Sequence, residues 1–391
     1  MSDVRKIYLE LCMSSVFRSV LTKPLFLHLA DYFREDATLE NRVRAYAAFV
    51  SEIYNGNSSL TDAVMRLVFE DENVYVKARA AKKPISDDIS LAVDRELSVF
   101  EKFAALTAED FRRDLNVFYV SPFASEHREF KLEYERRILD IDKHGYGIFA
   151  YNRMFRLADD GSLAPIISAD KSSLDLFVGY ADERIQVINN TQAFVDGRPA
   201  ANVLLCGDAG TGKSSTVKAI ANAFFESGVR LIELRKDQLS SLPYVMGKIS
   251  DNPLKFIIFI DDLSFNQNDD NFSMLKAALE GSASAKSDNA VIYATSNRRH
   301  IVKETFDDRD GGDVHRNDTM QEKLSLSERF GLVVLFQKPN KQLYLEIVHE
   351  LARRYGVEMD DGVLDIKAEA FALRRGNRSA RCAEQFIKSL I

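Results

Sequence analysis

The chain has 391 residues, of which 46% are hydrophobic, and its formal net charge at pH 7 is -7. This length suits two or three domains with substantial cores, and the acidic balance argues against general attraction to nucleic acid or anionic membranes. The three cysteines, Cys12, Cys206 and Cys382, show neither disulfide-framework nor metal-ligand spacing. The sequence shows neither a secretory signal nor a membrane-spanning run, so we expect a cytoplasmic protein without membrane association.

The N-terminal part, residues 1–170, is predicted to be a mostly α-helical domain that ends in a hairpin. Apolar residues recur at spacings of three and four over about residues 7–115, which is typical of amphipathic helices. Between residues 146 and 167 the pattern changes to two short strands, 154–157 and 163–166, joined by an Asp-Asp-Gly turn.

Residues 171–338 are predicted to form an α/β core, because strands and helices alternate as they do in a mostly parallel sheet covered by helices. The expected strands lie at 202–206, 230–234, 255–261, 290–295 and 332–336. Their continuous apolar character suits strands that are buried on both faces. Residues 339–391 show helical patterns only and are predicted to form a helical lid.

A glycine-rich loop follows the first core strand and leads into a helix, which is the setting of a nucleoside triphosphate cradle. Gly207 and Gly212 would let the backbone fold around a polyphosphate with its N–H groups pointing inward. Lys213 would place a cation near the β- and γ-phosphates, and Ser214 would offer its hydroxyl to Mg²⁺. The alternative is a loop that only connects a buried strand to a helix. The predicted cradle comprises Gly207, Asp208, Ala209, Gly210, Thr211, Gly212, Lys213, Ser214 and Ser215.

Polar side chains also follow other core strands. Asp261 is expected to hold Mg²⁺, and Asp262 to polarise a water that attacks the γ-phosphate, although two acids here could instead form an ordinary turn. Asn297 could bind both the γ-phosphate and that water, or could be a turn residue. Arg329, just before the last strand, could stabilise the transferring phosphoryl group across a subunit boundary, or could form a surface salt bridge.

The segment 243–247 has the aromatic, apolar and glycine residues of a translocating pore loop. Pro243 is also well placed in the first turn of a short helix. Because a buried aromatic and apolar segment is more often part of a core, a packing helix is the favoured interpretation.

Five segments carry a resemblance to the AAA+ ATPase superfamily, and most closely to an uncharacterised family of predicted AAA+ ATPases: GDAGTGKSS, FIIFIDDLSF, YATSNRRH, KLSLSERFGL and GNRSARCAEQF. The resemblance covers about residue 171 to the C-terminus. It implies ATP and Mg²⁺ as ligands and ATP-dependent assembly into a homo-oligomeric ring or arc, with nucleotide bound between subunits.

The same resemblance implies roles for individual residues. Lys213 and Ser214 match Walker A, Asp261 and Asp262 match Walker B, Asn297 matches sensor 1, and Arg329 matches the arginine finger. The backbone of Val178, Gly179 and Tyr180 would contact adenine. Arg378 resembles sensor 2, and Arg381, one helical turn later, is the competing choice.

Most AAA+ motors carry Glu where this chain has Asp262. The shorter side chain withdraws the carboxylate by about 1.5 Å, which can slow a reaction on the order of a hundredfold, so slow and switch-like turnover is expected. We therefore expect a loader or remodeller type of ATPase that acts on a protein or nucleic-acid client through its N-terminal region. The alternative is a nucleotide-gated binding module with negligible hydrolysis. A P-loop kinase is disfavoured, because Asn297 and Arg329 suit water attack and intersubunit sensing.

Overall fold

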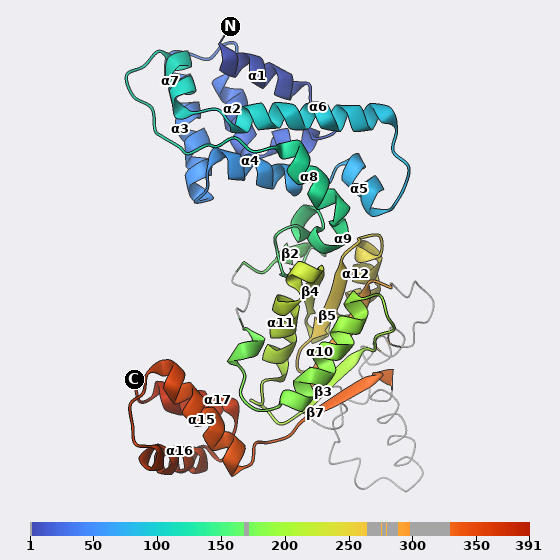
Figure 1. Ribbon diagram of the computed structural model, residues 1–391, viewed down its shortest axis with the longest axis vertical. Coiled ribbons are helices and arrows are strands. Elements are labelled where there is room, and N and C mark those ends of the chain that lie inside the picture. Colours follow the sequence, from blue (N-terminus) through green and yellow to red (C-terminus); the bar gives the residue numbers. More distant parts are fainter. Residues whose placement is uncertain (1, 168–171, 264–274, 276–278, 280–287, 298–328) are drawn as a thin grey trace. The chain divides into compact units, whose positions relative to one another are not determined.

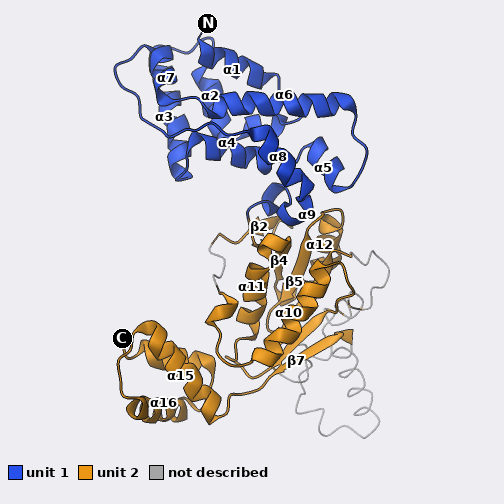
Figure 2. Cartoon of the chain, in the orientation of Figure 1, with its two compact units in different colours: residues 1–151 blue, residues 152–391 orange. Residues whose placement is uncertain are grey.

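The computed structural model describes residues 2–167, 172–263, 275, 279, 288–297 and 329–391. The chain forms two compact units, Met1–Tyr151 and Asn152–Ile391 (Figures 1 and 2). Within the described residues, none of the helices combines the length and the apolar character needed to cross a bilayer.

The first unit is helical over its described residues, as the apolar spacing predicts. Side chains at the helix starts accept backbone N–H groups that the helix itself leaves without a partner: Ser59 and Thr107 each form a capping box with the Asp three residues later. The elements of this unit are α1 (Asp3–Cys12), η1 (Arg18–Thr22), α2 (Pro24–Tyr32), α3 (Leu39–Asn55), α4 (Leu60–Phe69), α5 (Val74–Ala80), α6 (Asp87–Ala104), α7 (Ala108–Leu115), α8 (Phe130–Leu139), α9 (Ile141–His144) and η2 (Gly147–Phe149).

Aromatic rings fill much of the core of the first unit. Phe111 of α7 is fully buried, and its ring centroid lies 5.3 Å from that of Tyr46 and 5.5 Å from that of Phe49, both on α3. Such ring pairs add to the burial of apolar area, so these contacts hold α7 against α3.

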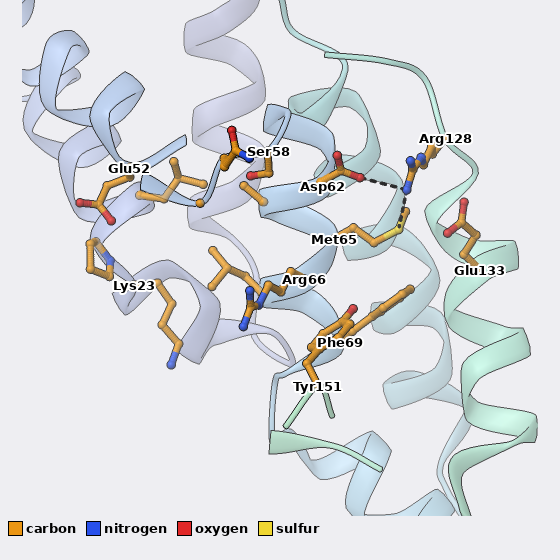
Figure 3. A pocket seen from close by; sticks show the side chains of 16 residues that line it. Lys23, Glu52, Ser58, Asp62, Met65, Arg66, Phe69, Arg128, Glu133 and Tyr151 are labelled. Atoms are coloured by element: carbon orange, nitrogen blue, oxygen red, sulfur yellow. Dashed lines mark hydrogen bonds and ion pairs between the residues drawn. The ribbon is translucent and has the colours of Figure 1, made fainter. Parts of the chain in front are cut away.

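A cavity of about 560 Å³ lies within the first unit (Figure 3). In this cavity Arg128 forms an ion pair of 3.2 Å with Asp62 and contacts the sulfur of Met65. Its charged lining residues are Lys23, Arg66, Arg128, Glu52, Asp62 and Glu133. Because acidic and basic groups are equally represented, the lining does not have the single sign of charge that attracts polyphosphates.

The second unit is built on a seven-stranded sheet in the order β2-β1-β4-β5-β6-β3-β7. Neighbouring strands are parallel except for the β1/β2 hairpin. The strands are β1 (Met154–Leu157), β2 (Leu163–Pro165), β3 (Val203–Gly207), β4 (Val229–Leu234), β5 (Lys255–Ile260), β6 (Ala290–Ser296) and β7 (Leu332–Phe336). The predicted α/β class is thereby confirmed, and each core strand begins and ends within one residue of its predicted bounds.

The hairpin belongs to this sheet and not to the helical unit. β1 pairs in parallel with β4, Met154 lying opposite Leu231, and both Met154 and Phe155 are buried. The boundary between the units therefore falls after Tyr151, earlier than the expected boundary at residue 170, because the hairpin buries its apolar residues against the sheet edge.

Helices α10 (Ala181–Val195) and α11 (Lys213–Ala223) pack on one face of the sheet (Figure 1). Val187 of α10 and Val217 and Ile220 of α11 share a buried cluster with strand residues such as Leu205. Segment 243–247 lies within α12 (Leu242–Ile249), as the interpretation as a helix predicts. Val245 is fully buried, whereas the aromatic residue Tyr244 is 51% exposed. The short helices of this part are η3 (Leu174–Leu176), η4 (Phe225–Ser227) and η5 (Lys236–Ser241).

After β7 the chain forms the helices α15 (Lys341–Tyr355), α16 (Asp361–Arg375) and α17 (Ala380–Lys388). They have a hydrophobic cluster of their own, in which Tyr344, Ile347 and Phe386 are buried. Val178, which precedes α10, packs against the same cluster. The lid therefore contacts the segment 178–180 as well as enclosing its own core.

Candidate functional site

The glycine-rich loop connects the buried strand β3 to α11, as predicted. Gly207 has a φ of +136°, and a Cβ atom there would lie 2.0 Å from the carbonyl oxygen of Phe336 on β7. Gly212, with a φ of +90°, is the N-cap of α11. Both positions require glycine, one for close approach of two backbones and one for its left-handed conformation. The loop thus places the N-terminus of α11 near the carboxyl end of β3. A helix N-terminus favours the binding of anions.

Lys213 is buried at the start of α11, with 5% of its surface exposed. Its Nζ donates to the carbonyl oxygens of Gly207 (3.0 Å) and Asp208 (2.7 Å) and to Oδ1 of Asn297 (3.1 Å). Burial lowers the pKa of the Lys213 ammonium, which the nearby carboxylate of Asp208 partly opposes. An anionic ligand would favour the charged form of this buried ammonium.

The acidic pair lies beside this lysine, because β5, β6 and β3 are neighbours in a parallel sheet and their carboxyl ends meet at one edge. The hydroxyl of Ser214 donates to Oδ1 of Asp261 at 2.6 Å, and Nδ2 of Asn297 donates to Oδ1 of Asp262 at 2.7 Å. Both carboxylates are exposed. Hydroxyl and carboxylate oxygens are the ligands that Mg²⁺ prefers, so Ser214 and Asp261 are chemically suited to hold this cation together with phosphate oxygens.

Thr295 is a member of this site that the sequence did not reveal. It lies on β6, is 2% exposed, and its hydroxyl bonds both Asp261 and the backbone N–H of Asp262. Asp208 was predicted only as a loop residue, yet its carboxylate also accepts the backbone N–H of Lys338 and ties the loop to the chain after β7. Neither contact has a signal in the local sequence.

The segment expected to contact adenine adopts an unusual backbone. Gly179 has a φ of +71°, and a Cβ atom there would lie 2.4 Å from Cδ1 of Leu343 in the lid. Tyr180 is also left-handed, with a φ of 54°, and its hydroxyl donates to the carbonyl of Gln337 at 2.6 Å. Arg184, which is 8% exposed, donates to the carbonyl of Gly179. The segment is thus held from both α10 and the lid.

Of the two lid arginines, Arg378 forms a bidentate pair with Glu369 of α16, at 3.0 and 2.7 Å. Arg381 lies at the phosphate loop: its backbone N–H donates to the carbonyl of Gly210 at 3.4 Å. A Cβ atom on Gly210 would lie 3.3 Å from the Cβ of Arg381. The backbone of Arg381 therefore lies at the loop, whereas the guanidinium of Arg378 is engaged within the lid.

A profile of the family described as "Protein of unknown function (DUF815)" matches residues 149–391, which is more than half of the chain. The chain belongs to the DUF815 family.

No curated protein sequence matches the chain significantly. Among solved structures it is similar to RuvB of Thermotoga maritima, a Holliday junction branch migration motor, with 15% identity, 56% of this chain and 72% of that chain covered, and a TM-score of 0.35. A variant of the same RuvB gives 14% identity, coverage of 57% and 73%, and a TM-score of 0.34.

This DUF815 protein has the AAA+ type of fold that its motifs predict. Its parallel strands place the strand of the phosphate loop between β6 and β7, and a helical lid follows β7. The predicted AAA+ type of fold is thereby confirmed, and the uncharacterised family to which the chain belongs is DUF815.

Arg329 lies apart from the other predicted site residues. It precedes β7, whose first residue, Leu332, pairs with Val203 at the start of β3, whereas Phe336 pairs with Gly207 at the phosphate loop. Five strand residues span roughly 16 Å, so Arg329 is at the opposite end of β7 from its own phosphate loop. Residues 298–328, which include parts of two of the motifs, lie outside the described residues.

Proposed function

We propose that this DUF815 protein binds ATP with Mg²⁺ and hydrolyses it slowly to switch the conformation of a partner. One observation carries the proposal: Lys213, Ser214, Asp261, Asp262 and Asn297 converge at a single edge of the sheet. A buried ammonium, a helix N-terminus and two carboxylates within hydrogen-bond reach suit a metal-bound triphosphate better than any uncharged ligand.

Each group has a distinct role in this proposal. Residues 207–215 enclose the phosphates, with Lys213 exchanging its bonds to backbone carbonyls for bonds to phosphate oxygens. Ser214 and Asp261 hold Mg²⁺, which neutralises charge on the phosphates when it is bound. Asp262 orients and deprotonates the attacking water, and Asn297, already bonded to Lys213 and Asp262, links that water to the γ-phosphate.

The second candidate, a nucleotide-gated module with negligible hydrolysis, is favoured by one contact. Asp262 is one methylene shorter than Glu, and its Oδ1 already accepts a hydrogen bond from Asn297. A carboxylate engaged in this way reaches a water less readily. Turnover separates the two candidates, because both require ATP binding.

The adenine contact is assigned to Val178, Gly179 and Tyr180, whose backbone is fixed by Arg184 and Leu343. Arg378 and Arg381 remain the candidates for sensor 2, and the contact with Gly210 favours Arg381. Because Arg329 lies at the far end of β7, it suits a role at the ATP of a neighbouring copy, in keeping with an ATP-dependent homo-oligomer.

The client is assigned to the N-terminal unit. The cavity there has balanced charge, which supports a protein segment over nucleic acid as its occupant. We place the activity in the cytoplasm, where ATP and Mg²⁺ are supplied.

The proposal is tested by titrating the full chain with a fluorescent ATP analogue and by measuring phosphate release. The unmodified chain should bind the analogue, and Lys213→Ala should weaken binding by about tenfold to a hundredfold, because a charge-assisted contact to phosphate is lost. Size-exclusion chromatography with and without ATP tests assembly in the same samples. Equal nucleotide affinity of the unmodified chain and Lys213→Ala contradicts the proposed site.

A further inference from the structure

The hydroxyl of Thr295 joins the two acidic residues to each other. It donates to Oδ1 of Asp261, and it accepts the backbone N–H of Asp262 at 3.0 Å. The backbone carbonyl of the same residue accepts the N–H of Leu263 at 2.7 Å. One buried residue of β6 therefore fixes three consecutive residues after β5.

The backbone of Asp262 needs such a restraint. Its φ of 51° lies in the left-handed region, which non-glycine residues seldom occupy unless their surroundings impose it. The N–H of Asp262 points to the hydroxyl of Thr295 and, at 3.1 Å, to Oδ1 of Asp261. With the backbone held in this conformation, the side chain of Asp262 meets Asn297.

In the part of the chain that the structure describes, the donors to Asp261 all reach the same oxygen. Among the described residues, Ser214, Thr295 and the N–H of Asp262 all donate to Oδ1. Because Asp261 is exposed, Oδ2 is left for a ligand from outside the chain. The orientation of this carboxylate therefore depends on donors behind it.

In the proposed function the oxygen of Ser214 is also a ligand of Mg²⁺, so the position of this donor depends on the cation and the phosphate loop. Thr295 is the side chain that holds Asp261 from within the sheet. It lies beneath the pair on β6 opposite Leu205 of β3. Its position in the sheet does not depend on the nucleotide.

We propose that Thr295 is a positioning residue that orients Asp261 toward the cation and Asp262 toward the attacking water. This inference rests on the proposed function and assigns a group that acts only through the two carboxylates. This positioning role differs from packing, because valine has the same shape as threonine but its methyl group can neither donate to Asp261 nor accept from Asp262.

The test compares Thr295→Val with Thr295→Ser in the full chain. Thr295→Val should leave the affinity for a fluorescent ATP analogue in EDTA unchanged, because the phosphate loop is intact. With ATP present, it should weaken Mn²⁺ binding measured by electron paramagnetic resonance, and it should lower kcat by roughly 10- to 100-fold with little change in KM. Thr295→Ser, which keeps the hydroxyl, should restore most of both properties.

Thr191→Val is the matched control. Thr191 is also fully buried, and its hydroxyl bonds the carbonyl of Val187 (2.8 Å) and the hydroxyl of Tyr293 (2.7 Å), away from the acidic pair. It should lower stability without changing Mn²⁺ affinity. The inference is overturned if Thr295→Val behaves as the unmodified chain, or if Thr191→Val reproduces its losses. Failure of the unmodified chain to bind the ATP analogue overturns the proposed function and the inference together.

Discussion

Both units use carboxylates to bind backbone N–H groups, but they do so in opposite surroundings. In the helical unit, Glu96 of α6 is 8% exposed and accepts the N–H groups of Ser15 (2.8 Å), Val16 (3.1 Å) and Phe17 (2.9 Å). In the α/β unit, Asp261 also accepts several donors, but it is exposed and they bind one oxygen.

The difference separates structural from chemical use of the same group. Both carboxylate oxygens of Glu96 accept hydrogen bonds from its own chain, and these bonds hold the segment after α1 against α6. Asp261 and Asp262 are oriented by hydrogen-bond donors from their own chain, and both side chains are exposed. A carboxylate that is buried and fully bonded stabilises the fold, whereas one that is fixed but exposed is available to a ligand.

Asp262→Asn tests the exposed carboxylates of the α/β unit and has the largest expected effect. Turnover should fall by about 10²- to 10⁴-fold, because the neutral amide cannot accept a proton from water. The free energy of unfolding should change by less than about 0.5 kcal/mol, since the side chain is exposed. Phosphate release and urea denaturation measure the two quantities. If the unmodified chain releases no phosphate above background, the nucleotide-gated module is the correct function.

Phe111→Ala tests the helical unit alone. The fully buried ring packs among Tyr46, Phe49 and other aromatic residues, so its removal should lower the free energy of unfolding by about 3–5 kcal/mol. Affinity for ATP should not change. Phe118→Ala is the control, because Phe118 is 99% exposed and its loss should cost less than about 0.5 kcal/mol. A matching loss of nucleotide affinity in Phe111→Ala contradicts the separation of the two units.

Glu96→Gln tests the buried carboxylate of the helical unit directly. It replaces one of the two acceptor oxygens with an NH2 group, which only donates, so it should destabilise the chain by about 1.5–3 kcal/mol. The change is measured by urea denaturation. Glu35→Gln, at an exposed position, should have little effect. Equal stability of the two variants contradicts the structural role of Glu96.

Replacing the lid arginines gives the smallest expected effect and tests which of them contacts the nucleotide. Arg381→Ala should weaken ATP binding by about tenfold, because its side chain begins beside Gly210. Arg378→Ala removes the half-buried pair with Glu369 and should alter ATP binding less, because that pair lies within the lid. Fluorescence titration with the ATP analogue measures both. The opposite order of effects assigns sensor 2 to Arg378.

Several elements could be read from the sequence because short-range patterns specify them. Strands β3 to β7 are mostly apolar, although β4 contains Arg230 and Glu233, and the phosphate loop needs its glycines at fixed positions. Helix α8 was not predicted, although Phe130, Tyr134 and Ile138 recur at a spacing of four and are buried. A long loop, residues 116–129, precedes α8, and only Asp140 separates it from the short helix α9.

Other features depend on contacts between distant residues. Thr295 contacts Asp261 across 34 positions, and Phe17 contacts Glu96 across 79. No local pattern specifies these partners, since they follow from which strands and helices become neighbours. The same holds for the hairpin, whose strands were predicted but whose pairing with β4 was not.

By itself the sequence determined the core strands, most of the helical regions, the phosphate loop and the residue types available for chemistry, because periodicity and backbone geometry act over a few residues. The tertiary structure alone decided which polar groups meet: it placed Thr295 behind the acidic pair and Arg381 beside Gly210. Such meetings are fixed by strand order and packing, which join parts of the chain that are far apart in sequence.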